Sequence, residues 1–293
     1  MNNLRSHLKR ILTKSVAPTL RAIAGPYYYE KIRSFAATGR WPDIDNPKTF
    51  NEKISHLKIF SAPPDASALA DKLAVRHVVK AAGYAHILPV IYAVFESEKE
   101  IDSVEELNLP DKYALKGNQG SGDDFVELVS PQNPFDLTEL KKRAKDIIRG
   151  KFGHLSNEPW YLEIKPKVFI EEHLGGTNGA PPADYKFFVF SGKVRAISVD
   201  SGRFTGNHLR TFYDRDWRPF SFQHPDLAPA QEEPVPSVID EMIEIAERLS
   251  GDAPFRRIDL YCIDDARIVF GEITIAPRAG YGHWPSEFAD FWQ

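Results

Sequence analysis

The spacing of apolar residues switches between helical and strand periods along this chain, and this alternation most limits the folds that it can adopt. Residues 47–60 have helical spacing and begin with a capping box of Thr49 and Glu52. A second helix is predicted over residues 71–83, where Gly83 provides the stop. Strand spacing follows at residues 89–95, 113–116 and 125–129, and a helix is predicted at 136–150. This order predicts a β-rich lobe with a helix over it.

The second half of the chain repeats this arrangement. A strand at 168–174 leads into a loop rich in glycine and proline, and Ser191 and Gly192 provide the turn of a hairpin. A helix over residues 239–249 and a last hairpin over residues 257–275 complete it. We therefore expect an α+β protein with two lobes, a cleft between them and a hinge near residues 170–184. The predicted parts are an N-terminal helical region at 1–70, a first lobe at 71–170 and a second lobe at 171–293.

Charge and cysteine content exclude several classes of protein. The 293 residues include 37 basic and 41 acidic side chains, with a formal net charge of -4. This balance does not favour binding to nucleic acid, so nucleic acid is not an expected partner. Cys262 is the single cysteine, which excludes an intramolecular disulfide and fits a reducing cytoplasm. No run approaches the roughly 20 apolar residues of a membrane span.

Residues 1–25 allow two interpretations. They contain five basic residues and no acidic residue, and Leu4, Leu8 and Ile11 recur at helical spacing. Such a helix can lie on the inner, anionic surface of a membrane, which would make the protein peripheral to it. The alternative is an amphipathic helix packed on the domain. We favour the second interpretation because Pro18 keeps the apolar stripe short.

The most informative residues for chemistry are Asp259 and Glu272 in the last hairpin. If Asp265 and Ala266 are the two central residues of its turn, Asp259 lies directly across from Glu272. Their Cβ atoms would then be about 5 Å apart and the carboxylates would repel each other. A divalent cation removes this repulsion, and hard oxygen ligands select Mg²⁺ or Mn²⁺. A longer turn would send one acid to solvent, and the Asp-Ala pair does not decide between the two registers.

In the same register Arg257 and Thr274 form the next pair on this face. A guanidinium beside two acids suits phosphate oxygens bridged by metal. The alternative is a simple salt bridge between arginine and carboxylate, which is the commoner case.

A second candidate site is the run from Lys116 to Gly122, which has three glycines after a lysine on a strand. Glycines let backbone N–H groups approach an anion, and lysine adds charge for phosphate oxygens. The spacing matches neither the Walker A pattern nor the dinucleotide fingerprint. We expect a hairpin lid over a nucleotide, although such loops are more often plain turns. A third segment, which contains Glu171 and Glu172 and is followed by Asp184, can offer a hinge strand to adenine and a carboxylate to ribose.

Taken together and in order, these segments resemble the TupA-like ATP-grasp family, which is named for teichuronopeptide biosynthesis. The matching stretches are 48–54 (KTFNEKI), 71–72 (DK) with 75–76 (VR), 114–118 (ALKGN), 165–167 (KPK), 184–188 (DYKFF) with 192–194 (GKV), 255–261 (FRRIDLY) and 270–274 (FGEIT). Several unrelated motifs in the right order are far more specific than any one of them. The resemblance extends over residues 40–282 and implies an ATP-grasp fold, in which two α+β lobes close on a nucleotide in the cleft between them.

The resemblance also implies roles for individual residues. The implied nucleotide contacts are Lys72, Lys116, the mobile loop of Gly120, Ser121 and Gly122, the hinge acids Glu171 and Glu172, and Asp184 with Lys186. The implied metal ligands are Asp259 and Glu272, with Thr274 where many ATP-grasp ligases carry asparagine. Arg257, Lys186 and Arg203 are the implied catalytic residues. Residues 277–280 (PRAG) replace the expected Pro-Gly-Ser-Gly.

The function implied is an ATP-dependent, ADP-forming carboxylate-amine ligase that uses Mg²⁺ or Mn²⁺ in cell-surface polysaccharide biosynthesis. Its substrates would be a small-molecule or glycan carboxylate and an amine such as an amino acid, and glycosyltransferases are expected partners. Two alternatives remain open. One is a kinase that phosphorylates a sugar or peptide hydroxyl on the same fold, and the other is a non-catalytic nucleotide-binding module of a glycan-assembly complex.

Overall fold

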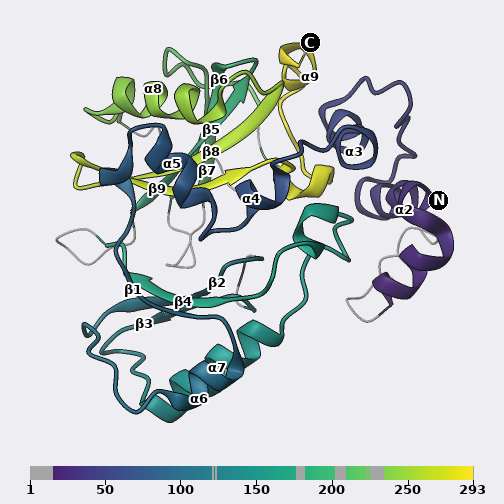
Figure 1. Ribbon diagram of the computed structural model, residues 1–293. Helices are drawn as coiled ribbons and strands as arrows, with labels where there is room; N and C mark the ends of the chain where they lie inside the picture. Colours follow the sequence, from purple (N-terminus) through teal and green to yellow (C-terminus); the bar gives the residue numbers. More distant parts are fainter. Residues whose placement is uncertain are drawn as a thin grey trace.

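The chain forms two antiparallel sheets that lie in separate lobes (Figure 1). The computed structural model describes residues 16–292, apart from residues 121, 123, 176–181, 202–208, 223 and 225–233. The strands are β1 (Ile91–Phe95), β2 (Tyr113–Gly117), β3 (Val126–Val129), β4 (Val168–Glu172), β5 (Ala183–Phe190), β6 (Lys193–Ser201), β7 (Leu209–Tyr213), β8 (Phe255–Ile263) and β9 (Arg267–Thr274). The helices are α2 (Ala17–Thr38), α3 (Phe50–Phe60), α4 (Ala66–Ala70), α5 (Val75–Ala81), α6 (Glu98–Ser103), α7 (Leu137–Arg149), α8 (Ile239–Ser250) and α9 (Phe288–Phe291). Three short turns of 3-10 type are η1 (Ala85–Ile87), η2 (Pro159–Leu162) and η3 (Pro277–Gly280).

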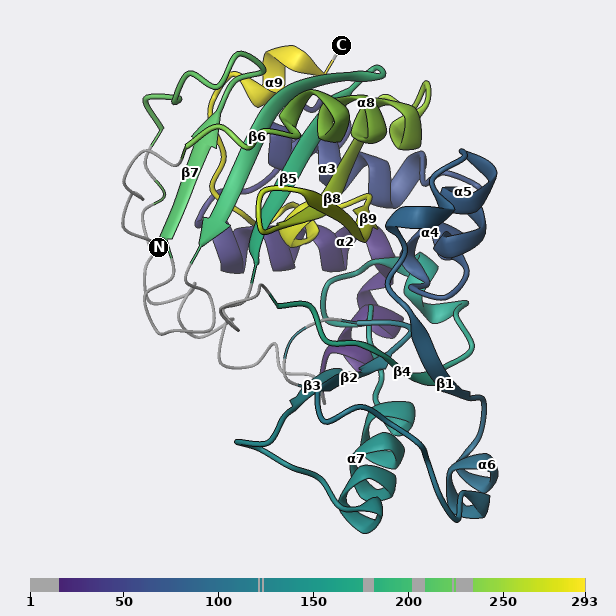
Figure 2. The same cartoon turned by 90° about the vertical axis from the view of Figure 1, so that its left-hand side faces the viewer.

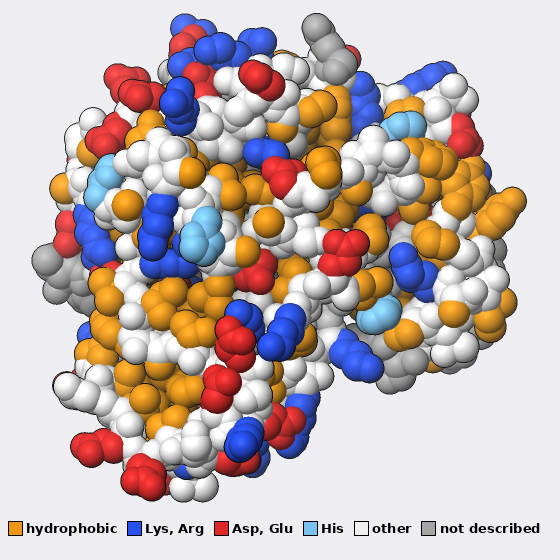
Figure 3. All heavy atoms as spheres, viewed as in Figure 1, with side chains coloured by type: hydrophobic (Ala, Val, Ile, Leu, Met, Phe, Trp, Pro, Cys, Tyr) orange, Lys and Arg blue, Asp and Glu red, His pale blue; other side chains and the backbone are white. Residues whose placement is uncertain are grey.

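The first sheet has the strand order β1-β4-β2-β3, and α6 and α7 lie along one side of it (Figure 1). Its core contains Phe95 and Ile170 from the strands and Leu140, Ala144 and Ile147 from α7. Helix α7 begins as predicted, because Asp136 and Glu139 form a capping box. Along these strands, the side chains between the core residues point to the opposite face of the sheet, toward the other lobe. Lys116 is one of them. Hydrophobic side chains also gather over β1 on the surface seen in Figure 3, where Tyr92 and Val94 are exposed.

The second sheet has the order β7-β6-β5-β8-β9, and Figure 2 shows β7, β6 and β5 side by side. Helix α8 packs on it through Met242 and Ala246. Ser191 (φ 46°) and Gly192 (φ 74°) form the turn between β5 and β6, as predicted. The helices before β1 also belong to this core, since Leu69 and Val79 are part of the apolar cluster of the second sheet. The domain boundaries at residues 70 and 170 stay a prediction.

The N-terminal helices lie beside both lobes (Figures 1 and 2). The predicted capping box of α3 is present, with Thr49 as the N-cap and Glu52 accepting from its backbone. Helix α2 is kinked at Gly25 (φ 74°), directly before Pro26. Residues 1–15 lie outside the described part, so the membrane-surface interpretation stays a prediction. Within the described ranges, no helix has both the length and the apolar character needed to cross a bilayer.

The helix predicted over residues 71–83 begins later than expected. Residues 71–74 form a turn instead, in which Asp71 Oδ1 accepts hydrogen bonds from the backbone N–H groups of Leu73 (2.8 Å) and Ala74 (3.1 Å). These two bonds have the pattern of an N-cap, so the turn leads directly into α5, which begins at Val75. The correction has a consequence for the site, since it places Lys72 on a turn and not within a helix.

The hairpin of β8 and β9 has the predicted register near the acids but not the predicted turn. Ile263 pairs with Arg267, so the loop has three residues, and Asp264 and Asp265 both have positive φ. This loop alone would shift the register by one residue. A β-bulge at Gly271 shifts it back, and Asp259 therefore pairs with Glu272 after all. The prediction of a two-residue turn was wrong, and a glycine inside a strand was the signal for the bulge.

Candidate functional site

A row of charged side chains crosses one face of the second sheet. The strand register pairs Lys186 with Asp259, and Asp259 in turn with Glu272. Side chains paired across antiparallel strands point to the same face. The row therefore brings together residues from β5, β8 and β9 that are 86 positions apart at most. Of this row, Lys186 and Asp259 are buried, whereas Glu272 is half-buried.

Arg257 joins the two acids. Its Nε and Nη2 atoms donate to Asp259 Oδ1 at 2.6 Å and to Asp259 Oδ2 at 2.7 Å. The same Nη2 donates to Glu272 Oε1 at 2.8 Å and to Thr274 Oγ1 at 2.9 Å. Thr274 in turn donates to Glu272 Oε1 at 3.0 Å. The sequence left open whether Arg257 binds phosphate or forms a salt bridge, and in this state of the protein it forms the salt bridge.

The row continues beyond the residues that the sequence suggested. Lys186 Nζ donates to Asp184 and, at 3.0 Å, to Asp259 Oδ2, and it lies 3.8 Å from Asp200 Oδ2. Asp200 is in turn held by both Nε and Nη2 of Arg210 on β7. Charged groups of both signs therefore contact one another over all five strands. Sequence reasoning missed Asp200 and Arg210, although a charged residue at the end of an apolar strand was a usable signal.

The charges in this row shift one another's ionisation. Burial raises the pKa of Glu272, but Arg257, Lys72 and Lys186 together lower it to about 2. Burial raises the pKa of Asp259 to about 6, although Arg257 and Lys186 act in the opposite direction. The pKa of Lys186 is raised, because Asp259 and Asp184 outweigh the effect of burial. Glu272 is therefore an anion at neutral pH, as a metal site requires.

The first lobe contributes the two lysines that the resemblance implies. Lys116 on β2 forms an ion pair with Glu171 on β4, and the ammonium of Lys72 donates to the carbonyl of Gly120. Burial lowers the pKa of Lys72, while Glu272 of the other lobe raises it and Lys116 lowers it further. Lys72 and Glu272 thus influence each other's pKa, although they come from distant parts of the chain.

Asn118 holds the first-lobe side of the cleft together, and sequence reasoning gave it no role. Its side chain is fully buried. It donates to Asp71 Oδ2 (2.9 Å) and to the carbonyl of Lys165 (3.1 Å), and it accepts from the backbone of Lys167 (2.8 Å). The backbone N–H of Lys72 donates to the Asn118 carbonyl at 2.8 Å. Asn118 therefore places the turn of Lys72 next to β2.

The glycine loop has the conformations that only glycine adopts easily. Gly120 has φ 80° and Gly122 has φ 78°. A Cβ atom on Gly120 would lie 2.7 Å from the ring of Phe125, so no larger residue fits there. Ser121 lies outside the described residues. The loop conformation fits a lid, and its contact with a nucleotide stays a prediction.

The hinge acids differ in their surroundings. Glu171 is buried and paired with Lys116, whereas Glu172 accepts from Arg267 of β9 at 2.6 Å and 2.9 Å. The second pair links the lobes beside β4. The nucleotide roles predicted for these residues and for Asp184 stay predictions, and Arg203 lies outside the described residues.

The chemistry of the donor set fits a magnesium-type ion. In the part of the chain that the structure describes, no three or more His, Cys, Asp or Glu side chains converge as ligands. However, Asp259 and Glu272 face each other and offer hard anionic oxygens, with the Thr274 hydroxyl beside Glu272. Mg²⁺ in phosphate-transferring sites commonly takes one or two carboxylates and completes its shell with phosphate and water. Two facing carboxylates are therefore sufficient protein ligands.

A further buried carboxylate near the site, Glu158, was missed by sequence reasoning. It is 7% exposed and lies on the segment before η2. Burial raises its pKa to about 7; Lys58 and Ser156 lower it, and Glu30 and Glu272 raise it. No local sequence signal could have found it, because its environment comes from segments far away in the chain.

This shift predicts a pH dependence of stability. The pKa of Glu158 in the folded protein is raised above its usual value of 4.5 to about 7, so the folded state binds the extra proton between these values. Stability must therefore fall as pH rises from 4.5 to 7. Glu158→Gln has no charge to bury, so its stability relative to wild type should increase over this window by about 3 kcal/mol. Urea denaturation at pH 5 and pH 8 gives the free energies of unfolding of Glu158→Gln and wild type. The same difference between the two proteins at both pH values would contradict the prediction.

Comparison with known proteins identifies the family. The model of the family described as TupA-like ATPgrasp matches residues 52–291. A search of curated proteins gave no match. Similar solved structures include the VanG D-Ala:D-Ser ligase from Enterococcus faecalis (16% identity, TM-score 0.45, 78% of this chain and 61% of that one). Another is the D-alanine--D-alanine ligase from Bacillus anthracis (14%, 0.44, 80% and 72%).

A third is carboxyaminoimidazole ribonucleotide synthase from Aspergillus clavatus complexed with ATP (12% identity, TM-score 0.44, 72% of this chain and 45% of that one). This chain spans about half the length of this synthase and of several other similar solved structures. The two α+β lobes with antiparallel sheets are those of an ATP-grasp fold, as the sequence predicted. Because the family model matches most of the sequence, the chain belongs to the TupA-like ATP-grasp family.

Proposed function

We propose that this protein is an ATP-dependent, ADP-forming ligase that joins a carboxylate to an amine. The observation that supports this most is the arrangement of Asp259, Arg257 and Glu272 opposite Lys72 across the cleft. Such a set offers both signs of charge to a triphosphate: carboxylates that hold a divalent cation, and cations that meet phosphate oxygens directly.

The nucleotide is proposed to lie between the lobes. Lys72, Lys116 and Lys186 neutralise the phosphate oxygens, and the loop of Gly120 and Gly122 covers them. Each lysine is now paired with a group that nucleotide can replace: Lys116 with Glu171, Lys186 with Asp184, and Lys72 with a carbonyl of the loop. When nucleotide binds, its phosphate oxygens replace these partners. Nucleotide binding is thereby coupled to closure of the loop. Asp259 and Glu272, with Thr274 as a neutral oxygen donor, would hold Mg²⁺ or Mn²⁺, which would withdraw charge from the phosphate groups.

The first chemical step is transfer of the γ-phosphoryl group to the substrate carboxylate. A carboxylate oxygen attacks the γ-phosphorus, the bond to the bridging oxygen breaks, and ADP leaves with the electron pair. Arg257 would stabilise the charge that develops on the transferred group, once it exchanges one of its acidic partners for phosphate. Arg203 is proposed to assist it. Closure of the glycine loop protects the acyl phosphate from water.

The second step is attack of an amine on the acyl carbon. The nitrogen forms the amide bond, the bond to phosphate breaks, and the amine loses a proton. The products are an amide, ADP and phosphate. The charged row of the second sheet stabilises the tetrahedral intermediate through Arg257 and Lys186.

The biological setting that we propose is cell-surface polysaccharide biosynthesis, capsule included, since the family is named for teichuronopeptide biosynthesis. The carboxylate would then be a uronic acid or another small-molecule or glycan acid, and the amine an amino acid. ATP places the reaction in the cytoplasm, where glycosyltransferases are the expected partners. Contact with the inner membrane surface through residues 1–25 would bring the enzyme to a lipid-linked glycan.

Release of phosphate tests the proposal. Purified protein, ATP and Mg²⁺ are incubated with uronic acids alone and with uronic acids plus amino acids, and ADP and free phosphate are both measured. A ligase releases equal amounts of ADP and phosphate, and only when both substrates are present. ADP without free phosphate would show transfer to a hydroxyl instead. If the protein binds ATP but forms no ADP under any condition, only the non-catalytic nucleotide-binding module remains.

A further inference from the structure

A buried ion pair outside the proposed nucleotide site connects the N-terminal helices to the end of β9. Lys58 of α3 and Glu30 of α2 have side chains with no exposed surface, and Lys58 Nζ lies 2.8 Å from Glu30 Oε1. Glu30 also accepts from Ser55 (2.7 Å), Asn157 (2.9 Å) and Tyr281 (2.9 Å). Both carboxylate oxygens of Glu30 therefore accept hydrogen bonds. A buried ion pair whose hydrogen bonds are satisfied in this way holds a defined geometry.

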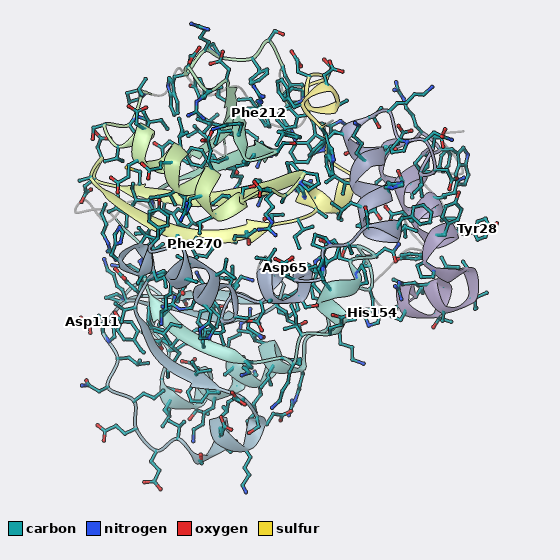
Figure 4. All side chains as sticks on the ribbon, turned by 45° about the horizontal axis from the view of Figure 1, so that its top comes forward. Tyr28, Asp65, Asp111, His154, Phe212 and Phe270 are labelled. Atoms are coloured by element: carbon teal, nitrogen blue, oxygen red, sulfur yellow. The ribbon has the colours of Figure 1, made fainter. Side chains whose placement is uncertain are left out.

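The ammonium of Lys58 brings two turns together. It donates to the carbonyl of Ser156 at 3.0 Å and to the carbonyl of Ala279 at 2.8 Å. Ser156 and Ala279 come from distant parts of the chain. The turn of Ser156 also contains His154, which is labelled in Figure 4, and it adjoins the N-terminal helices. The hydroxyl of Tyr281 donates to Glu30 and makes a longer contact of 3.4 Å with Ser156. The buried pair of Lys58 and Glu30, together with Tyr281, thus fixes the two turns against each other.

Both turns contain non-glycine residues in the left-handed region. Asn157 has φ 57°, and the consecutive residues Arg278 and Ala279 have φ 52° and φ 54°. Two such residues in a row are unfavourable, and a glycine at each position would remove the strain. Gly280 is constrained too, since a Cβ there would lie 2.8 Å from Ile54 Cγ2. Backbone strain held in place by a buried network is typical of sites that position a functional side chain.

The two turns present opposite charges next to the proposed site. Arg278 is exposed, and it lies four residues after Thr274, so the turn begins where the metal-site strand ends. Glu158 directly follows Asn157, is buried, and interacts electrostatically with Glu272. Among the described residues, none forms a hydrogen bond or ion pair with the Arg278 guanidinium. A guanidinium and a carboxylate are therefore carried by two turns that Lys58 holds together.

We propose that these turns form the binding site of the amine substrate, and that this substrate is an amino acid: Glu158 binds its ammonium group and Arg278 its carboxylate. The inference rests on the proposed ligase function, because it assigns the second substrate of that reaction. Arginine suits a carboxylate through paired hydrogen bonds, and a buried carboxylate beside the site suits an ammonium. The site fixes the amine near the acyl group that it attacks.

The test uses calorimetric titration of the full-length protein with each of the twenty L-amino acids, in the presence of a non-hydrolysable ATP analogue and Mg²⁺. The best binder is then compared with its amide, which lacks the carboxylate charge, and with its N-acetyl derivative, which lacks the ammonium. Wild type should bind each derivative roughly 10- to 100-fold more weakly than the amino acid, as expected for the loss of one charge-assisted contact.

Arg278→Gly separates binding from folding. Glycine relieves the left-handed strain, so the midpoint of thermal unfolding should be at or above that of wild type. The variant should nevertheless bind the amino acid no better than its amide. Glu158→Gln, in turn, should bind the amino acid no better than its N-acetyl derivative. The matched control is Asp264→Gly, another exposed residue with positive φ (51°) in the distant turn of β8 and β9, which should keep both preferences.

The outcomes distinguish this inference from the function on which it rests. If Arg278→Gly keeps the preference for the amino acid over its amide, the assignment is wrong. It is equally wrong if wild type binds the nucleotide analogue but none of the amino acids. If wild type does not bind the nucleotide, the proposed function itself fails.

Discussion

Glu272→Gln and Asp259→Asn should each reduce the release of ADP by roughly 10³-fold or more. Both substitutions keep the size of the side chain but remove one of the two facing charges. The negative charge that would hold a divalent cation beside the triphosphate is then halved. Glu272→Gln is the sharper variant, because Glu272 is half-buried and the fold loses less when its charge is removed. A coupled assay of ADP release measures the effect.

Two controls make this result interpretable. Asp265→Asn changes a carboxylate in the turn of the same hairpin and should release ADP as wild type does. Thermal unfolding should show that Glu272→Gln remains folded at the assay temperature. ADP release within tenfold of wild type by a folded Glu272→Gln protein would show that the acidic pair is not the centre of the chemistry.

Lys58→Met should destabilise the protein by about 3 to 5 kcal/mol, because it leaves the Glu30 carboxylate buried without its cation. The methionine fills a similar volume, so the loss reflects charge and hydrogen bonds more than packing. Three acceptors lose their donor as well: the carbonyls of Ser156 and Ala279 and the hydroxyl of Tyr281. Denaturation in urea gives the change in the free energy of unfolding.

A double-mutant cycle isolates the contribution of the pair. Glu30→Gln removes the buried charge and keeps one of the two oxygen acceptors, of which Oε1 serves Ser55 and Oε2 serves Tyr281. Lys58→Met/Glu30→Gln should therefore be less destabilised than the sum of the single variants, by about 2 kcal/mol. Lys80→Met, at an exposed lysine of α5, should stay within about 0.5 kcal/mol of wild type. Additive effects in the cycle would mean that the two charges contribute independently.

Local signals predicted the elements that depend on neighbouring residues. The capping box of Thr49 and Glu52 lies within one turn of helix, and the turn at Ser191 and Gly192 joins strands that follow directly. Such features need no knowledge of the rest of the chain. The helix predicted to start at residue 71 starts at Val75, although Asp71 accepts two backbone N–H bonds in the pattern of an N-cap.

The facing acids were predicted correctly through an incorrect turn. The loop between β8 and β9 is one residue longer than expected, and the bulge at Gly271 compensates for it. Sequence spacing alone could not separate this case from a simple two-residue turn, because both place Asp259 opposite Glu272. A Cβ on Gly271 would lie 2.9 Å from the carbonyl oxygen of Asp259, so the bulge requires glycine.

The sequence by itself determined the two-lobed α+β order, the family and the residues that carry charge into the cleft, because these depend on local periodicity and on ordered motifs. Only the tertiary structure decided which charges meet. Lys72 lies near Glu272, Asp200 extends the row of the second sheet, and Lys58 is buried against Glu30. The physical reason is that burial and electrostatic interaction depend on distance in space, and separation along a chain does not record it.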